Sequence, residues 1–451
     1  MADRKWLKRQ AEQVRKVDWI DPQLYRKYGV KRGLRNDNGT GVLVGLTTIG
    51  NVHGYVMDEG EKQPIPGELY YRGINVRDIV QADKREHRFG YEETAYLLLF
   101  GALPTARELV DWKNRVGKYR RLSDGFKENA IMKHPPKDLM NALARAVLFA
   151  YAYDPEENPD DLSIEKCLEQ SVDLIGSIPT IAAYAYQAKA HYHDNGPLMI
   201  RNPDPEKSTA ENILMLTRED GKYTRLEAET LDLALILHAE HGGGNNSSFT
   251  THVVTSSHSD IYSSVAASIL SLKGARHGGA NLRVMRQMEE IKAKSGDWRK
   301  QDNVVRYLEK IADGKAGDGS GLVYGLGHAV YTISDPRAQM LKEKARMLAK
   351  EKKREDEMRL FECIETCGPE VIRARHPRAE AVCANVDLYS GFVYDMLGVP
   401  KDLYTPLFAV ARCVSWCAHR MEELVNAGPI IRPAYKPIFH PKEYVPLMKR
   451  K

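Results

Sequence analysis

The sequence predicts a mainly α-helical protein with a short β-hairpin region near its N-terminus. Residues 40–75 are rich in Val, Thr, Tyr and Gly, a composition typical of short strands and turns. Beyond this region apolar residues recur mostly at helical spacing. The 451 residues, of which 43% are hydrophobic, suffice for two or three domains with sizeable cores, or for one large domain with a smaller partner.

Helical periodicity defines most of the chain. Stretches such as ALARAVLFAYAY and DLALILHAEH are apolar nearly all round, which is typical of buried helices in a large globule. The run LKEKARMLAKEKKREDEMR (341–359) instead indicates a solvated helix face. Helices are predicted over 92–101, 105–119, 136–154, 164–191, 226–241, 259–273, 280–295, 301–312, 336–353, 387–397 and 402–425.

Composition excludes several classes of protein. The net charge is +5, and no basic stripe is interleaved with aromatics, so nucleic acid is not an expected partner. No apolar run reaches the roughly 18 residues of a membrane helix. The basic N-terminus contains Asp3, Glu12 and Asp18 and lacks an apolar signal core, which favours a surface helix of a cytoplasmic protein over a targeting peptide.

The six cysteines indicate neither a disulfide scaffold nor a metal site. Cys363/Cys367 and Cys413/Cys417 are i,i+4 pairs in helical sequence, and no CxxC occurs. We therefore expect small core residues in a reducing cytosol.

Three segments place His or Asp beside Gly, Asn or Ser: 238–249, 321–337 and 383–391. In the first, His241 is predicted in the last turn of a helix that ends at three glycines, which let a ligand or other backbone approach closely. The alternative is a histidine that only caps helix carbonyls. A metal pair of His238 with His241 is disfavoured, because HExxH and a third ligand are missing.

The second segment is a Gly-rich loop that ends at His328 and lacks the Walker and dinucleotide-binding motifs. Asp335 and Pro336 predict a helix start. Arg337 then opposes the helix dipole in the first turn, which suggests an anionic ligand. In the third segment Asp387 is either a functional carboxylate or an N-cap residue, and the residues alone leave both open.

Two further arginines complete the candidates. Arg412 lies in an otherwise apolar helix, where a buried charge demands an anionic partner. Arg432 lies on an extended, Pro-rich C-terminal arm, and the alternative for it is an ordinary surface residue.

Taken in this order, these segments closely resemble the citrate synthase family. The shared patterns are H-x-G-G-N-x-S, then G-x-G-H-A-V with D-P-R beginning seven residues after the His, then N-V-D-x-x-S-G, F-x-x-x-R and a terminal R-P. RGINVRDIV, ETAYLLLFGALPT and GARHGGAN fit the same family. The resemblance covers roughly residues 40–440.

The resemblance implies condensation of acetyl-CoA with oxaloacetate and then thioester hydrolysis, with no metal or redox cofactor. It also implies a homodimer with shared active sites. The large helical domain would comprise 1–275 and 391–451, with an N-terminal extension to about residue 38, and the small domain 276–390. The implied residues are His241, His328 and Asp387 for catalysis, Arg337, Arg412 and Arg432 for oxaloacetate, and Val323, Tyr324, Gly325, Leu326 and Gly327 for coenzyme A.

The sequence departs from the family pattern at two places. Residues 331–334 lack the basic side chains that many members place there for CoA phosphates, and Arg378 is the proposed substitute, with Arg375 as a weaker candidate. The stretch 209–216 lacks the family's additional histidine; His191 and His193 lie nearby, but no motif assigns them.

Two alternatives stay open. One is 2-methylcitrate synthase, which uses propionyl-CoA, because one extra methylene discriminates by only ~1–3 kcal/mol. The other is a catalytically silent CoA-binding homologue, against which the intact catalytic set argues.

Overall fold

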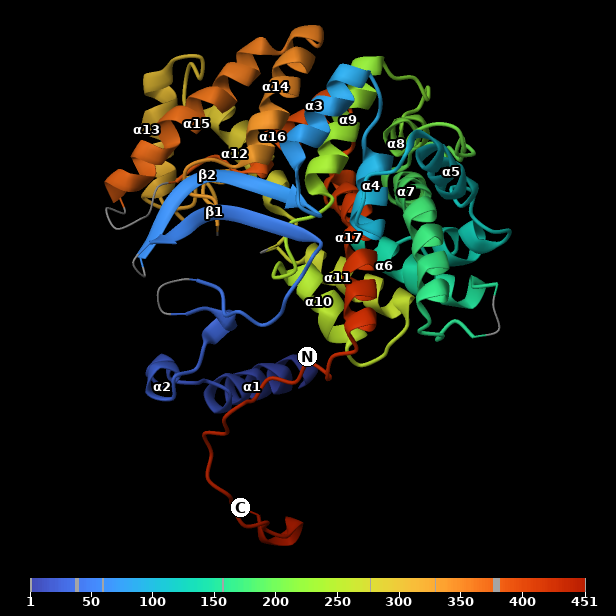
Figure 1. Ribbon diagram of the computed structural model, residues 1–451. Helices are drawn as coiled ribbons and strands as arrows, with labels where there is room; N and C mark the ends of the chain where they lie inside the picture. The colour runs from blue at the N-terminus through green and yellow to red at the C-terminus, as the bar shows by residue number, and fades with distance from the viewer. Residues whose placement is uncertain are drawn as a thin grey trace. The chain divides into compact units, whose positions relative to one another are not determined.

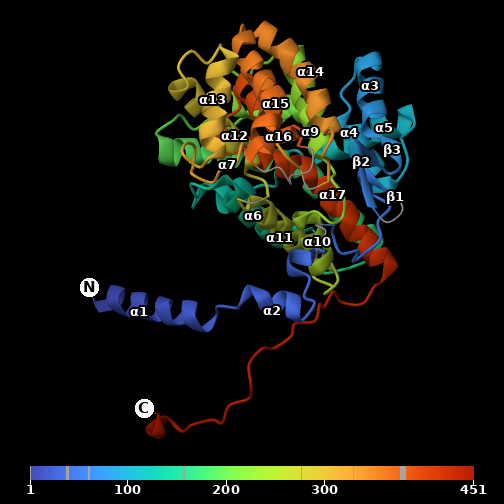
Figure 2. The same cartoon turned by 90° about the vertical axis from the view of Figure 1, so that its left-hand side faces the viewer.

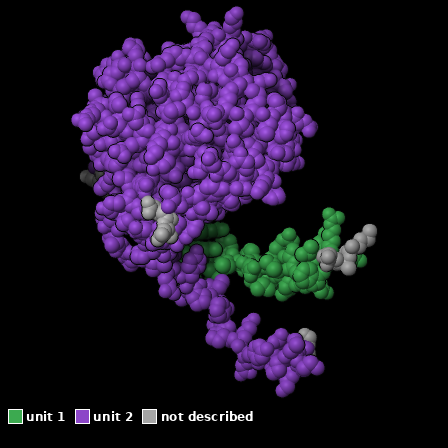
Figure 3. Space-filling view, turned by 90° about the vertical axis from the view of Figure 1, so that its right-hand side faces the viewer, with its two compact units in different colours: residues 1–46 green, residues 47–451 purple. Residues whose placement is uncertain are grey.

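The computed structural model describes residues 2–36, 40–58, 61–155, 158–275, 277–328, 330–375 and 382–450. It separates into two compact units, 1–46 and 47–451, coloured separately in Figure 3. The first unit contains α1 (Ala2–Val17) and α2 (Pro22–Lys27), so the predicted N-terminal helix is confirmed. All further elements belong to the second unit.

A three-stranded antiparallel sheet opens the second unit. Strand β1 (Gly50–Asp58) pairs with β2 (Glu61–Tyr71), whose end pairs with β3 (Ile74–Asn75). Figure 1 shows β1 and β2 as one long hairpin beside the helices. This confirms the predicted hairpin region.

The rest of the second unit is predominantly helical, as predicted. No helix in the described ranges combines the length and the apolar composition that a membrane crossing needs. The α-helices, in chain order, are α3 (Val76–Glu86), α4 (Tyr91–Phe100), α5 (Ala106–Lys118), α6 (Leu139–Ala150), α7 (Ile164–Asp194), α8 (Thr209–Thr217), α9 (Arg225–His238), α10 (Asn246–Thr255), α11 (Ile261–Lys273), α12 (Ala280–Lys294), α13 (Gln301–Ala312), α14 (Pro336–Glu351), α15 (Glu355–Arg375), α16 (Val386–Met396) and α17 (Tyr404–Asn426).

Some helices differ from the sequence prediction. The run 341–359 is not one helix face but the end of α14 and the start of α15, separated at Lys353, whose φ of 55° interrupts the helix. Helices α3, α8, α10 and α15 were not predicted. For α10 the local signal is short: Asn245 caps it by accepting a hydrogen bond from the Ser248 N–H.

Helices α9 and α17 lie at the centre of the second unit. The described residues of α17 are buried from Tyr404 to Arg420, because the helix packs against α4, α7, α9 and α10. Helices α12 to α16 group on one side of α9 (Figures 1 and 2), with α14 and α16 packed against it. The division into a large domain and a small domain at 276–390 stays a prediction.

Candidate active site

His241 lies three residues beyond the end of α9, so its predicted place in the last helical turn is wrong. The helix ends at His238, and the chain turns at Gly242, whose φ is +81°. The His241 ring lies 5.0 Å from the His328 ring, and its Nε2 is buried without a hydrogen-bond partner among the described residues. Burial, and then the charge of Arg337, lowers the pKa of His241 well below its usual value. His241 is therefore a neutral imidazole with a free polar atom.

His328 follows the Gly-rich loop and is held by backbone. Its Nδ1 accepts hydrogen bonds from the N–H groups of Val330 (3.1 Å) and Tyr331 (3.0 Å). Burial and the charge of Arg337 lower its pKa to about 4. A neutral imidazole that accepts at Nδ1 carries its proton on Nε2, so His328 presents an Nε2–H donor.

Tyr331 packs between the two histidines and the hairpin. Its ring stacks on His328 with centroids 4.6 Å apart, and its hydroxyl donates to the Glu68 carbonyl (3.2 Å). Strand β1 packs closely against the segment after His328, since a Cβ on Gly54 would lie 2.7 Å from the Val330 oxygen. The hairpin therefore fixes the segment that follows His328.

Arg337 lies in the first turn of α14 as predicted, after Asp335 as N-cap and Pro336 at the first position. Its guanidinium forms a buried ion pair with Asp335, with Nη2 2.8 Å from Oδ2 and Nε 3.1 Å from Oδ1. Nη2 also lies 3.5 Å from Nε2 of His328. The carboxylate keeps the arginine charged, and its pKa is raised despite burial.

Arg412 is equally buried on α17, but it forms no ion pair with a carboxylate in the described part of the chain. Its Nε donates to the His238 carbonyl (2.7 Å), and its Nη2 is buried without a hydrogen-bond partner among the described residues. Burial lowers its pKa to about 10, partly offset by the charge of Glu240. An unpaired buried guanidinium nitrogen is costly unless an anion completes it.

Asp387 is half-buried in the first turn of α16. Asn385, not Asp387, caps this helix, because its Oδ1 accepts from the Asp387 N–H (3.0 Å). The alternative of an N-cap aspartate is therefore wrong, and the Asp387 carboxylate is not used as a cap. Burial raises its pKa to about 6, with Arg337 lowering it and Asp335 raising it.

The loop 323–327 lies directly against the start of α16. Leu326 forms an antiparallel bridge with Ala384, and the Asn385 side chain donates to the Gly327 carbonyl (2.8 Å). Gly325 has a φ of +88°, and a Cβ there would lie 2.9 Å from the Leu388 side chain. The structure thus brings the loop next to Asp387.

Comparison with known proteins decides the family. The family model described as "Citrate synthase, C-terminal domain" matches residues 38–434. A citrate synthase of Haloferax volcanii is 33% identical over 408 residues, which are 90% of this chain and 94% of the relative. The chain belongs to the citrate synthase family. Members of this family are acyltransferases.

Other matches include one further sequence relative and two solved structures. The 2-methylcitrate synthase 1 of Corynebacterium glutamicum is 30% identical, covering 93% of this chain and 98% of its own. A citrate synthase from Thermoplasma acidophilum, solved as a ternary complex with carboxymethyl coenzyme A and oxaloacetate, matches with a TM-score of 0.76 and 26% identity over 93% and 99% of the two chains. The citrate synthase of Pyrobaculum aerophilum matches with a TM-score of 0.72 and 30% identity, over 91% and 94%.

Several predicted residues are not gathered at this site. Arg432 is exposed on the C-terminal arm, beside Ile431, whose N–H donates to Ser256 Oγ (3.1 Å). Arg378 lies outside the described residues. Arg375 pairs with Asp313 and Glu309.

His191 and His193 also make their hydrogen-bond contacts away from the predicted catalytic residues. His191 contacts the Gly196 carbonyl, and His193 contacts that of Pro135, each through one ring nitrogen. Neither contact is with a predicted site residue.

Other residues of the site were missed by sequence reasoning. Tyr331 was not singled out and Asp335 was identified only as a helix start, although both follow His328 closely in the sequence. His277, from the GARHGGAN stretch, contacts Ser247 through Nε2 (3.1 Å to Oγ), with burial lowering its pKa to about 4. No local signal marked Glu240, which precedes His241 and is completely buried.

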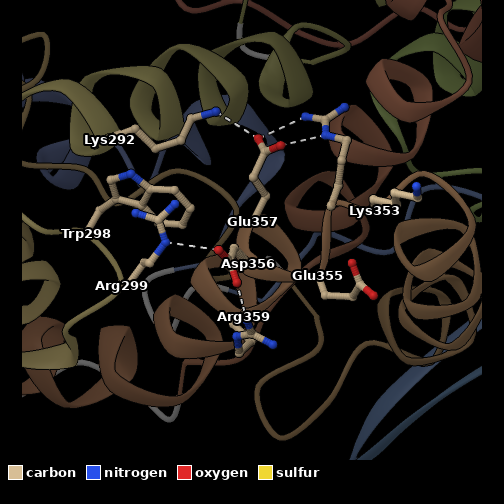
Figure 4. Close-up of a pocket in the computed structure, with 9 residues that line it drawn as sticks. Lys292, Trp298, Arg299, Lys353, Glu355, Asp356, Glu357 and Arg359 are labelled. Atoms are coloured by element: carbon tan, nitrogen blue, oxygen red, sulfur yellow. Dashed lines mark hydrogen bonds and ion pairs between the residues drawn. The ribbon is translucent and has the colours of Figure 1, made fainter.

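A separate pocket of about 710 Å³ lies where α14 passes into α15 (Figure 4). None of the predicted catalytic residues lines it. Its cations are largely neutralised, since Lys292 and Arg354 both pair with Glu357 (Figure 4). It is therefore a weaker candidate than the histidine site.

Proposed function

We propose that this chain condenses acetyl-CoA with oxaloacetate and hydrolyses the resulting thioester to give citrate and CoA. The observation that carries the proposal is the 5.0 Å approach of two neutral imidazoles, His241 and His328, with two buried arginines beside them. Such a set can polarise two carbonyl oxygens while holding a dianion.

Asp387 serves as the general base in this proposal. A thioester methyl is a weak carbon acid, and a carboxylate whose pKa is raised to about 6 is a stronger base than an ordinary aspartate yet still ionised at neutral pH. Asn385 caps the start of α16, so the Asp387 side chain is not needed as a helix cap and can serve as the base.

The two histidines stabilise oxygen charge in the transition state. His241 would donate to the thioester oxygen as the enol forms, a role that needs the neutral ring its buried position enforces. His328 would donate its Nε2–H to the ketone oxygen of oxaloacetate and pass on that proton as the enol carbon attacks. Its backbone contacts at Nδ1 hold the required tautomer in place.

The arginines bind the carboxylates of oxaloacetate. Arg412 offers the unpartnered Nη2, and Arg337 adds positive charge beside His328. The adenine of coenzyme A would bind at the loop 323–327, beside Asp387. The related Thermoplasma enzyme is named for a complex with a coenzyme A analogue and oxaloacetate, which supports this choice of substrates.

A second candidate function is 2-methylcitrate synthesis from propionyl-CoA. It is favoured by the relative of that name in Corynebacterium glutamicum. Thiol release from acetyl-CoA and propionyl-CoA, each with oxaloacetate, decides between them. We expect the higher kcat/KM with acetyl-CoA. A higher value with propionyl-CoA would assign the second function, and release with neither would contradict both.

We further propose a cytoplasmic homodimer in which Arg432 completes the partner's site. The exposed place of Arg432 on an extended arm supports this, since the side chain lies with none of the other site residues of its own chain. The test co-expresses Asp387→Ala with Arg432→Ala. If Arg432 acts in trans, random pairing leaves about a quarter of all sites intact. If mixed dimers confirmed by mass show no recovered activity, Arg432 acts within its own chain.

A further inference from the structure

Behind the turn that carries His241, two other histidines face each other. His252 on α10 and His419 on α17 bring Nε2 and Nδ1 within 3.2 Å, and we call them the imidazole pair. A Cβ on Gly243 would lie 3.3 Å from Cε1 of His419 and 3.6 Å from Nε2 of His252. The imidazole pair therefore lies directly beneath the catalytic turn, and the proposed mechanism does not use it.

The outer nitrogens of the pair both contact carboxylates. Nδ1 of His252 lies 2.8 Å from Oε2 of Glu423, and Nε2 of His419 lies 3.1 Å from Oε2 of Glu240. An ionised carboxylate can only accept, so both outer nitrogens carry protons. Two neutral rings would then point lone pairs at each other across 3.2 Å. One additional proton between the inner nitrogens removes this repulsion.

The surroundings place that proton on His419. Its ring is fully buried, with Glu240 on one side and Glu422 Oε2 3.8 Å from Nδ1 on the other. Burial alone would lower its pKa, but the charge and hydrogen bond of Glu240, and then those of Glu422, raise it to about 9. Burial and the neighbouring His419 charge lower the pKa of His252. His419 is therefore the imidazolium, and His252 accepts from it.

The charges around the pair balance with one proton. The facing carboxylates are Glu240, before the turn, and Glu422 and Glu423 on α17. Burial opposes ionisation of Glu240 and Glu422, but their hydrogen bonds and cationic neighbours lower both pKa values to about 2. Among the described residues the nearby cations are Arg412 and Arg72, so the imidazolium of His419 makes the local charges equal.

Glu240 connects the imidazole pair to the catalytic turn. Its Oε1 accepts from the Gly242 N–H, and its Oε2 accepts from Ser415 Oγ. Its backbone oxygen accepts from the Tyr71 hydroxyl (3.3 Å). His241 is the residue between the two anchored ones, Glu240 and Gly242. Any displacement of the Glu240 side chain therefore shifts the backbone from which His241 projects.

We infer that protonated His419, supported by His252, is a positioning residue that holds Glu240 and thereby aims the His241 ring. The inference rests on the proposed catalytic role of His241. Donor atoms of His252, His419 and Glu422 lie within 4.8 Å of one another, so a divalent cation could occupy the same place. The charge balance favours the proton, and the experiment distinguishes the two.

The test replaces His419 by Gln, which can still donate to Glu240 but carries no charge. A misplaced catalytic group costs on the order of 10²-fold, so we expect kcat to fall by that order while KM for oxaloacetate changes less. Wild-type kcat should also decline as the pH rises through about 9, where His419 loses its proton. This decline should be missing in His419→Gln. In a double-mutant cycle with Glu240→Gln the two losses should not add, because both break one contact.

Arg420→Lys is the matched control. Arg420 is the next residue on α17, equally buried, and donates instead to Ser264 Oγ (2.9 Å). We expect it to lower the melting temperature while kcat per folded enzyme stays at the wild-type value. If His419→Gln behaves in the same way, its role is only structural and the inference is wrong. Should His419→Gln not fold, His252→Gln replaces it, with a smaller loss of kcat expected.

Two measurements separate this inference from its alternatives. A stoichiometric divalent metal in the purified enzyme, measured by mass spectrometry, would overturn the shared proton. Thermal melting against pH does not depend on catalysis. Since the folded pKa of His419 lies above 6.5, its stabilisation is complete below that pH and is lost as the pH rises through about 9. If wild type lacks thiol release but shows this loss, the proposed function fails while the shared proton stands.

Discussion

The candidate site has two halves, one around His328 and one around His241, and a buried arginine has different neighbours in each. Around His328, Arg337 is neutralised by Asp335, and Asp335 Oδ2 also accepts from the Val386 N–H (3.2 Å). Around His241, Arg412 has a buried nitrogen without a partner, and so does the imidazole itself, among the described residues. Arg337 is thus paired within the chain, whereas Arg412 and His241 each keep a polar atom that a ligand can satisfy.

The difference shows that Arg337 is already paired with a carboxylate, whereas Arg412 keeps a guanidinium nitrogen without a partner among the described residues. A buried ion pair such as Arg337–Asp335 is costly to break, because losing one partner leaves the other charge buried and unpaired. Arg412, by contrast, bears the cost of burial in the unliganded protein, a cost that binding of a carboxylate would relieve.

The largest effect should come from Asp387→Asn. The charges of Arg337 and Asp335 both act on the Asp387 carboxylate. Replacing Asp387 by Asn removes the proposed base and leaves both arginines in place. We expect a loss of roughly 10²–10⁴-fold in condensation rate, measured by thiol release. Oxaloacetate binding by calorimetry and the circular dichroism spectrum should be retained. Turnover within about tenfold of wild type would contradict the base assignment.

Replacing each arginine by leucine would sharpen the comparison. Arg337→Leu strands the Asp335 carboxylate, so we expect about 3–5 kcal/mol of lost stability in denaturant unfolding. Arg412→Leu should cost less stability than Arg337→Leu, because it breaks no direct ion pair, but should weaken oxaloacetate binding by about 2–5 kcal/mol. Each variant serves as the other's control. Equal losses of stability would show that the two halves do not differ in this way.

The pH dependence should give the smallest effect. The Asp387 carboxylate must be ionised to act as a base, so kcat/KM should fall about tenfold per unit as the pH drops below about 6. Because this folded pKa lies above the ordinary 3.8, stability should decrease as the pH rises from about 4 to about 6. Asp387→Asn should abolish that decrease in thermal melting. A profile flat to pH 5 would contradict the raised pKa.

The sequence by itself determined the helical fold class and most helix positions, because periodicity and capping act over a few residues. Asp335 and Pro336 fixed the start of α14 locally, as predicted. Where two local signals competed, the sequence could not decide: Asn385 rather than Asp387 caps α16, and α9 ends three residues before His241. Ordered motifs still identified the family, and they are the source of the residues proposed here for catalysis.

Only the tertiary structure decided how these residues are charged and held. The His328 tautomer follows from the N–H groups of Val330 and Tyr331, whose segment packs against the hairpin. The contact of His419 with Glu240 joins positions 179 residues apart. Such pairings depend on burial and on which helices meet, and α17 meets α9 and α10 only after folding. A residue pattern read along the chain contains neither the desolvation that shifts a pKa nor the distant carboxylate that opposes it.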